Sequence, residues 1–412
     1  MAVIHAKQAL LKDGWARNVR ISIADGGIAT LETDAAAAPG DERHDTLVSG
    51  MPNLHSHAFQ RGMAGLAETR GPGSDSFWSW RNVMYRFALS MTPDDVEAVA
   101  GQLYVEMLEA GFTRVGEFHY LHHDKDGGHY GDIAEMAARI AAAASATGIA
   151  LTLLPVFYAH AGFGGTAPGE GQRRFINDRD SYARLLERCR ALTGGLPGGI
   201  TGVAPHSLRA VTPEELAAVV AMAGEKPIHI HIAEQVKEVE DSIAWCGRRP
   251  VEWLLDNQTV DGRWCFIHAT HMTDAETLGM AKAGAIAGLC PVTEANLGDG
   301  TFPAVDFFAA GGRFGVGSDS NVLIGLPDEL RQLEYSLRLF HRARNVLAAP
   351  GGSTGRALFD GAVAGGAAAL GVEAGIAAGL PADLVSVKAR HGLDLAGDAL
   401  LDGWVFANGA QG

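Results

Sequence analysis

The sequence predicts an α/β fold: a TIM-type (β/α)8 barrel with a small β-sandwich-like domain built from both ends of the chain. Eight short apolar runs, each followed by a helix-like stretch, fill the middle of the 412-residue chain. Polar side chains capable of chemistry stand at the carboxyl ends of most runs, where barrel enzymes carry their catalytic groups. Both chain ends instead contain short alternating segments separated by turns. We therefore expect residues 1–48 and 378–412 to form the small domain and residues 49–377 the barrel.

The eight apolar runs are the predicted barrel strands, because continuous apolar strands alternating with helices are typical of parallel sheets. They start at Leu47, Thr113, Ala150, Gly199, Pro227, Arg263, Ala285 and Arg313. Helical patterns lie between them; before PEELAAVVAMAG, for example, Thr212 is a suitable N-cap and Pro213 suits the first helical position. A doubly wound sheet is the alternative, but its first strand would more often lead into a glycine-rich phosphate loop. The glycine-rich segment from Ala161 lacks that context, and we interpret it as a flexible loop.

The two ends of the chain are expected to be β structure. Near the N-terminus, ARNVRISIADGGIATLET has short apolar runs around the turn signal Asp25-Gly26-Gly27. Near the C-terminus, ADLVSVKA and LLDGWVFANG have the same pattern, the second with a turn at Asp402-Gly403. These segments suggest one small sheet domain contributed by both termini.

Composition excludes several classes of protein. With 47% hydrophobic and 20% charged residues, the chain has too much apolar material for a disordered protein. A formal charge of -15 without a basic stretch argues against nucleic acid and anionic membranes as partners. The longest apolar stretch, from Ile140, is interrupted by Gly148 and Pro155, which predicts a buried helix and strand instead of a membrane span.

Cysteine usage and the N-terminal residues indicate the compartment. The four cysteines are scattered, so we expect neither a disulfide framework nor a cysteine-ligated zinc site. Lys7, Lys12 and Asp13 interrupt any apolar signal region. We therefore expect a cytoplasmic protein.

Histidines and one aspartate follow strands that lie far apart in the sequence. The first strand ends in His55-Ser56-His57, and strand alternation places both imidazoles on one side. The fifth strand carries His229 and His231, and strand alternation alone does not show which of them belongs to the site. The sixth strand ends in His268 and the eighth in Asp319. An H-x-H pair alone is weak evidence for a metal site. The four strands together are stronger evidence, because their polar residues meet at one rim if the barrel is correct.

This combination resembles the amidohydrolase superfamily, whose members also carry a small β domain built from both termini. Several segments between residue 51 and about residue 322 resemble the formimidoylglutamate deiminases in particular: MPNLHSHAFQRGMAGL, SFWSWRNVMY, PHSLRAV, HIHIAEQ, LCPVTEANLGDG and VGSDSN. The resemblance implies hydrolytic deimination of N-formimino-L-glutamate to N-formyl-L-glutamate and ammonia, in histidine degradation. It also implies a homodimer.

The resemblance assigns roles to the residues at the strand ends. The implied ligands of the metal are His55, His57, His231 and Asp319, and zinc is the expected ion. Binuclear relatives carry a carboxylated lysine on the fourth strand, but GITGVAPHSL has no lysine, so we expect one divalent metal per chain. Glu234 is the expected proton shuttle. His268 is expected to hydrogen-bond the attacking water or the tetrahedral centre, and Asp319 counts among the catalytic residues.

The implied substrate is a cationic amidine with two carboxylates, so the site needs groups that bind anions. Arg209 follows the fourth strand and can bind a carboxylate in a two-pronged fork. The other expected substrate contacts are His206, Gln60 and Tyr120. Trp80 and Arg81 are candidates for a lid. We expect five other histidines to be structural or solvated: His229 in the core, and at the surface His119, His122, His123 and His129.

Two other functions compete with this one. The first is a deaminase of a neutral ring, of the guanine, cytosine or S-adenosylhomocysteine type, which would use the same metal site but has less need of Arg209 and His206. The second is a non-catalytic barrel that serves as a scaffold. Scaffold relatives lose metal ligands, whereas all four implied ligands and Glu234 are present here.

Overall fold

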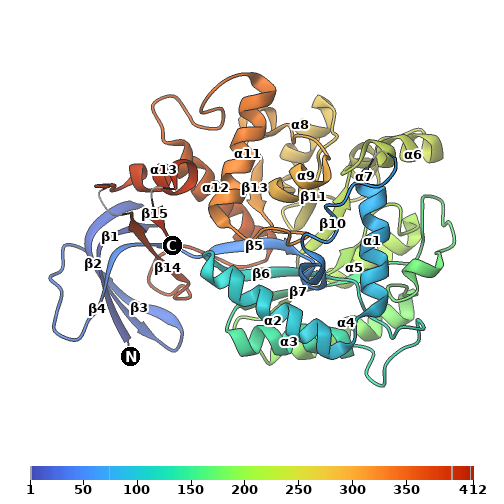
Figure 1. Cartoon of the computed structure of the whole chain (residues 1–412), viewed down its shortest axis with the longest axis horizontal. Coiled ribbons are helices and arrows are strands. Elements are labelled where there is room, and N and C mark those ends of the chain that lie inside the picture. The colour runs from blue at the N-terminus through green and yellow to red at the C-terminus, as the bar shows by residue number, and fades with distance from the viewer. Residues whose placement is uncertain (1, 74, 391–392, 409) are drawn as a thin grey trace.

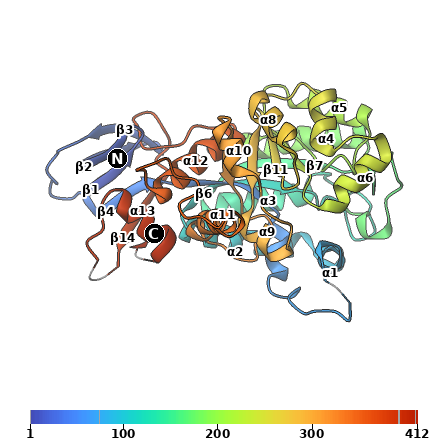
Figure 2. The same cartoon turned by 90° about the horizontal axis from the view of Figure 1, so that it is seen from above.

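The computed structural model describes residues 2–73, 75–390, 393–408 and 410–412. Figure 1 shows a small sheet with both termini on one side and a larger body of strands and helices on the other. The view from above in Figure 2 keeps the same two parts at opposite ends of the molecule. No helix in the described ranges is long and apolar enough to cross a bilayer.

The larger body is a barrel of parallel strands, as predicted. Its strands are β5 (Met51–Ser56), β6 (Phe112–His119), β7 (Ala150–Phe157), β8 (Ile200–Thr201) with β9 (Ala204–Pro205), β10 (Ile228–Ile232), β11 (Trp264–His268), β12 (Ile286–Leu289) and β13 (Arg313–Val316). They pair in the orders β5-β6-β7-β8 and β10-β11-β12-β13, and β9 pairs with β7. Parallel bridges Val203–Ile228 and Ser56–Asp319 join the two sheets at both seams. The fourth predicted strand is therefore in two short pieces. The first begins at Met51 and not at Leu47, because residues 47–49 belong to the small sheet, and the others lie close to their predicted positions.

Helices surround the barrel and connect its strands. They are α1 (Phe77–Ser90), α2 (Pro93–Glu109), α3 (Glu135–Thr147), α4 (Arg179–Gly194), α5 (Pro213–Ala223), α6 (Val236–Cys246), α7 (Pro250–Asn257), α8 (Asp274–Ala283), α9 (Pro291–Leu297), α10 (Ala304–Ala309), α11 (Leu326–His341) and α12 (Thr354–Ala369), with short 3-10 helices at Ala58–Met63 and Glu170–Gln172. The predicted cap of α5 is confirmed: Thr212 accepts from Glu215 N, and the Glu215 side chain accepts from Thr212 N in return. The apolar stretch from Ile140 divides into α3 and β7, as its glycine and proline predicted.

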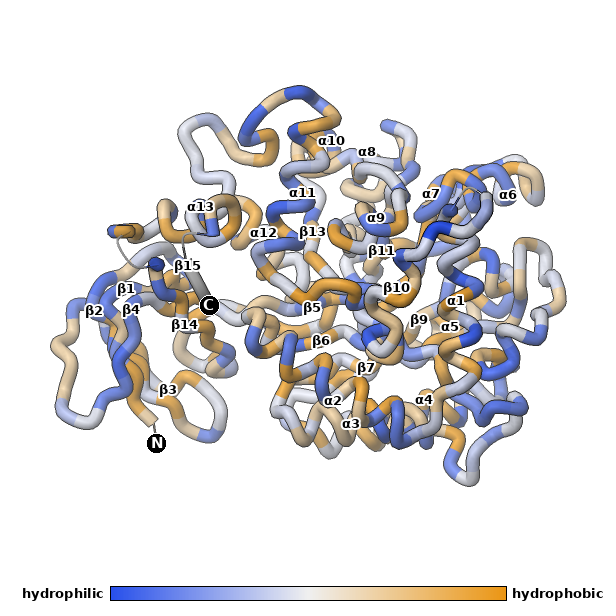
Figure 3. Tube along the Cα trace, viewed as in Figure 1, coloured by the Kyte–Doolittle hydropathy of each residue, from blue (hydrophilic) through white to orange (hydrophobic). Residues whose placement is uncertain are grey.

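Apolar side chains fill the barrel, and Figure 3 shows the hydrophobic colour along β5 and β10 in the middle of the larger body. One buried group lies where β5, β11 and β12 meet the end of α12: Leu54, Cys265, Ile267, Ile286, Cys290, Ala369 and Leu370. Helix α12 packs against β13 with glycine at the contact. A Cβ at Gly365 would stand 1.8 Å from the carbonyl oxygen of Phe314, so no larger residue allows this approach.

The small part is a single sheet, where the sequence suggested a sandwich. Its strands are β1 (Ala2–Leu11), β2 (Gly14–Ala24), β3 (Gly27–Glu32), β4 (Glu42–Ser49), β14 (Leu384–Ala389) and β15 (Ala410–Gln411). They pair in the order β15-β14-β4-β1-β2-β3, so both ends of the chain contribute. The predicted turn after Ala24 is confirmed, with Asp25 and Gly26 at positive φ. The domain limits at residues 48 and 378 stay a prediction.

The second C-terminal segment is a helix, which corrects the prediction of a strand pair. Residues Asp398–Ala407 form α13. Its buried side chains are Leu400, Leu401, Trp404 and Val405, a spacing that fits one helix face. Asp402 does not make a turn, because its carboxylate accepts from Ser353 Oγ at 2.8 Å and Gly355 N at 2.7 Å at the start of α12. The contact that decides between turn and helix thus comes from a distant segment.

The segment after β6 buries most of its histidines, which corrects the prediction that all four are solvated. His119, His122 and His123 are buried and His129 is exposed. His122 Nε2 donates to a backbone carbonyl at 2.9 Å and His123 Nε2 donates to Ile176 O at 2.8 Å. Both backbone N–H groups donate to Arg174 O. These partners come from β7 and from the segment around Arg174 and Ile176, so no local pattern indicates the burial.

We expect these buried imidazoles to make the protein acid-sensitive. Burial lowers the pKa of His123 from 6.5 to about 4 and lowers that of His122 as well. The unfolded chain therefore binds more protons than the folded one below about pH 6.5, and stability falls as the pH falls through this window. For His123 the loss is on the order of 2 kcal/mol between about pH 7 and about pH 5.

Denaturant unfolding at several pH values measures this. His123→Gln, whose amide can still donate to Ile176 O, should lose less stability on acidification than wild type, each compared with its own value near pH 8. Parallel pH curves for the two proteins would contradict the prediction.

Candidate active site

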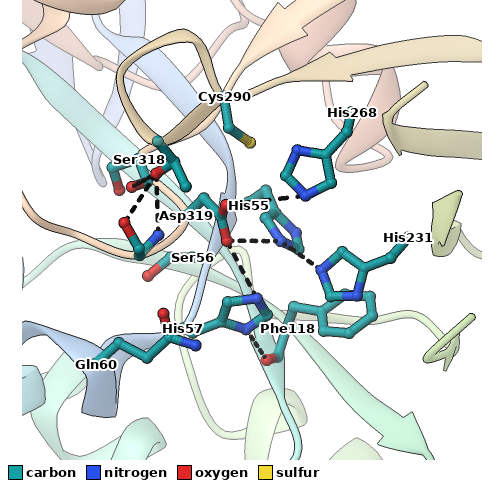
Figure 4. Close-up of polar contacts among 12 residues, drawn as sticks. His55, Ser56, His57, Gln60, Phe118, His231, His268, Cys290, Ser318 and Asp319 are labelled. Atoms are coloured by element: carbon teal, nitrogen blue, oxygen red, sulfur yellow. Dashed lines mark hydrogen bonds and ion pairs between the residues drawn. The ribbon is translucent and has the colours of Figure 1, made fainter. Parts of the chain in front are cut away.

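Four side chains from three strand ends converge at one rim of the barrel, as Figure 4 shows. His55 and His57 come from the end of β5, His231 from β10, and Asp319 from the segment after β13. His55 Nε2 lies 3.0 Å from His231 Nε2 and 3.4 Å from Asp319 Oδ1, and His57 Nε2 lies 3.2 Å from the same oxygen. All four donor atoms are within 4.8 Å of one another, and all four residues are buried. Between the two histidines of β10, the structure brings His231 into this group.

The donor set fits a divalent cation. His57 Nδ1 donates to Phe118 O at 2.9 Å, so in the neutral ring Nε2 holds a lone pair that faces the Asp319 carboxylate. Burial lowers the pKa of His55 to about 3 and lowers that of His231 strongly, which keeps both rings neutral. Neutral imidazoles and a carboxylate are the ligands that zinc and similar ions prefer. A cation among them accounts for lone pairs that otherwise face each other without a proton.

Backbone and amide hydrogen bonds hold these side chains in place. Asp319 N donates to His55 O at 2.9 Å and His57 N donates to Asp319 O at 3.0 Å, so the seam between β5 and β13 aligns them. Asp319 itself has a φ of 48°, in the left-handed region. Asn321 Nδ2 donates to His57 O at 3.0 Å, and its Oδ1 accepts from Ser318 Oγ at 2.6 Å. Sequence reasoning missed Ser318 and Asn321, although both stand in the quoted segment VGSDSN.

Glu234 and His268 lie next to the four donors. His268 Nε2 is 3.9 Å from both Glu234 Oε1 and Asp319 Oδ2. Burial raises the pKa of Glu234 to about 7 against the opposing effect of His268. Burial alone would lower the pKa of His268, but Glu234 and the neighbouring carboxylates raise it to about 10. The pair can therefore exchange and hold a proton near neutral pH.

Two further buried acids, which sequence reasoning did not single out, surround this pair. Glu294 Oε1 lies 3.3 Å from His268 Nδ1. Asp299 lies within 4.8 Å of Glu234 and His268, accepts from Gln235 Nε2, and has its pKa raised to about 9 by burial and by Glu234. Both stand in LCPVTEANLGDG. Their residue types gave a signal, but only the folded chain shows that they approach His268.

A pocket opens above the four donors and contains every expected substrate contact. Gln60, Tyr120, His206 and Arg209 all line it, together with Glu234 and His268. Gln60 Nε2 donates to Tyr120 Oη at 2.8 Å. Arg209 is buried, and its Nε lies 4.0 Å from Glu238 Oε2. Every predicted site residue except His55 therefore lines this cavity. His229 instead lies in the core, with its Nε2 2.8 Å from Ala369 O.

Helix α1 closes one side of the pocket. The residues that it contributes repeat at helical spacing and form one face: Phe77, Trp80, Arg81, Met84 and Tyr85. The Arg81 guanidinium carbon lies 4.5 Å from the Trp78 ring centre. Arg81 is thus a second arginine on the cavity wall, contributed by α1, whereas Arg209 follows β9. The suspected lid segment does border the site.

Comparisons with known proteins match the whole chain. Residues 46–407 match the amidohydrolase family, and residues 1–45 match the N-terminal domain of formimidoylglutamate deiminase HutF. The formimidoylglutamate deiminase of Pseudomonas aeruginosa is 54% identical over 99% of this chain and 91% of its own length. A 5-methylthioadenosine/S-adenosylhomocysteine deaminase of Natronomonas pharaonis is 27% identical over 90% of this chain and 80% of its own. The crystal structure of an amidohydrolase from Brucella melitensis superposes with a TM-score of 0.98 and 67% identity, covering 100% of this chain and 92% of that one.

Proposed function

The chain belongs to the amidohydrolase family, and from this premise we propose that it hydrolyses the formimino group of N-formimino-L-glutamate, yielding N-formyl-L-glutamate and ammonia in histidine degradation. The observation that carries the proposal is one buried pocket with a cation-binding donor set, Glu234 beside it, and arginines at positions 81 and 209. The identity to a formimidoylglutamate deiminase supports the same substrate. Family resemblance supports a homodimer, and four free cysteines support a reducing compartment such as the cytoplasm.

The site would hold one divalent metal, with zinc as the expected ion, through His55, His57, His231 and Asp319. A divalent metal bound by such ligands supplies a water of lowered pKa as the nucleophile. No lysine stands on β8 or β9 to bridge a second ion, which supports a single metal.

The protein's own groups then move the protons. Glu234 takes a proton from the attacking water and returns it to the departing nitrogen, a role that suits its pKa of about 7. His268, held by Glu294, donates to the oxygen that becomes negative at the tetrahedral centre. Asp319 accepts a hydrogen bond from the same water as it approaches the amidine carbon. Burial in the pocket strengthens each of these interactions.

The substrate carboxylates need cationic partners, because the chain as a whole carries a formal charge of -15. Arg209 and Arg81 line the pocket and supply one guanidinium for each carboxylate. Gln60, Tyr120 and His206 supply further donors along the wall. A neutral ring would leave both guanidinium groups unused, so the pocket favours the dianionic amidine.

The neutral-ring alternative has one observation in its favour, the similarity to 5-methylthioadenosine/S-adenosylhomocysteine deaminases. Ammonia release from N-formimino-L-glutamate, S-adenosylhomocysteine, guanine and cytosine, measured side by side, separates the two functions. We expect turnover of the first compound only.

The active protein should contain about one equivalent of metal per chain. His57→Ala and Asp319→Asn should each lose metal and activity together, because three ligands bind an ion much more weakly than four. Elemental analysis of purified wild type and variants is the measurement. Two equivalents per chain in fully active protein would contradict a single-metal site.

Glu234→Gln should keep the fold and the metal but lose turnover. A general acid-base group contributes roughly 10²–10⁴-fold, and more when it acts as a unit with the nucleophile. Steady-state kinetics with a metal assay on the same sample tests this. A variant within a few-fold of wild-type kcat would show that Glu234 only begins a helix.

Arg209→Met should raise KM for N-formimino-L-glutamate without changing the metal content. Loss of one partner of a buried charge pair costs on the order of 2–5 kcal/mol, and a remote carboxylate is bound in ground and transition states alike. Arg209→Lys should recover only part of this, because an ammonium lacks the planar fork. Unchanged kcat/KM in Arg209→Met would show that Arg209 does not anchor a substrate carboxylate, and the neutral-ring deaminase would then be the better-supported function.

A further inference from the structure

Glu238 is a fully buried acid that none of the steps above uses. It lies in the first turn of α6, four residues after Glu234, with 0% of its surface exposed. Its two carboxylate oxygens face different parts of the site. Oε1 accepts the backbone N–H of Ala233 at 3.0 Å, and Oε2 lies 4.0 Å from Arg209 Nε.

The first contact supports the turn that carries the metal ligand and the proton shuttle. Ala233 stands between His231 and Glu234 and has a φ of 53°, in the left-handed region that residues with a Cβ seldom occupy. The Ala233 carbonyl accepts from His271 N at 3.0 Å. Hydrogen bonds from Ala233 N to the Glu238 carboxylate and from His271 N to Ala233 O thus hold this residue in its unusual conformation.

The second contact faces the carboxylate anchor. Arg209 Nε and Glu238 Oε2 are both buried, and neither atom has a hydrogen-bond partner within the described part of the chain. Burial alone would lower the pKa of Arg209, but Glu238 and the neighbouring groups raise it. The guanidinium therefore keeps its charge inside the protein. Since Arg209 also lines the pocket, its other N–H groups are available to a ligand.

We propose that Glu238 is a positioning residue that orients the Arg209 guanidinium toward the substrate carboxylate while it holds the turn between His231 and Glu234. This inference rests on the proposed function, because it needs a substrate that carries a carboxylate. One rigid side chain thereby sets the distance between the carboxylate anchor and the proton shuttle. A formimino group can then reach Glu234 only when the carboxylate at the other end of the molecule sits on Arg209.

The variant Glu238→Gln separates the two contacts. Its amide oxygen can still accept from Ala233 N, but its NH2 group faces Arg209 with a donor in place of a charge. KM for N-formimino-L-glutamate should rise about fivefold or more, with metal content and kcat close to wild type. N-propylformamidine, which has no carboxylate, should be turned over as slowly by the variant as by wild type. Glu240→Gln, which removes an exposed carboxylate from the same helix, is the matched control and should change neither substrate.

A double-mutant cycle tests whether Glu238 acts through Arg209. In the Arg209→Met background, Glu238→Gln should change KM by less than about twofold, because the group that it orients is gone. A full repeat of its single-variant effect would overturn the proposal. An unchanged or lowered KM in Glu238→Gln alone, or an equal loss with both substrates, would overturn it too.

If Glu238→Gln alone does not fold, thermal unfolding of the Arg209→Met variants still tests the pairing of Glu238 with Arg209. Arg209→Met leaves a buried carboxylate unpaired, so Arg209→Met/Glu238→Gln should melt at a higher temperature than Arg209→Met. An equal or lower melting temperature would overturn the pairing. Failure of wild type to release ammonia from N-formimino-L-glutamate, by contrast, would reject the proposed function, and the melting comparison would still decide the pairing.

Discussion

The barrel closes where β13 meets β5, and the rest of the site depends on that seam. Two backbone hydrogen bonds join the first and last strands of the barrel: Asp319 N donates to His55 O, and His57 N donates to Asp319 O. They place three of the four convergent donors within one small volume. His231 completes the group from the opposite side, and its Nε2 lies 3.0 Å from that of His55. The meeting of His55 with Asp319, from opposite ends of the barrel sequence, is therefore a direct consequence of closing a parallel sheet into a ring.

Charge balance is the second constraint on the pocket. Glu234, Glu294, Asp299 and Asp319 are all buried near one rim. Burial raises the pKa values of Glu234 and Asp299, which is the free-energy cost of holding several carboxylates together in a medium of low polarity. The same carboxylates raise the pKa of His268, and a divalent cation at the four donors would offset a further part of that cost. The same arrangement leaves protonatable groups around the reacting centre, which general acid-base chemistry requires.

In the proposed function, substrate selection depends on residues other than the four donors. The pocket wall contains Arg209 from the segment after β9 and Arg81 from α1, which lies outside the ring of strands. In the proposed function, the two arginines are the groups that distinguish a dianionic amidine from a neutral ring. Glu238 connects Arg209 with the reacting centre, because it contacts the turn before Glu234 and faces Arg209.

Local patterns in the sequence determined the eight strands, the cap at Thr212, and the positions of the histidines and Asp319 at strand ends. Burial and side-chain alternation act over a few residues, so these features are visible without a fold. Only the tertiary structure decided the helix at Asp398–Ala407, the burial of His122 and His123, the choice of His231 over its neighbour, and the face that α1 turns to the pocket. Each of these depends on contacts between segments far apart in the chain. No short stretch of sequence contains that information, because the partner that stabilises one conformation over the other is supplied by a different part of the fold.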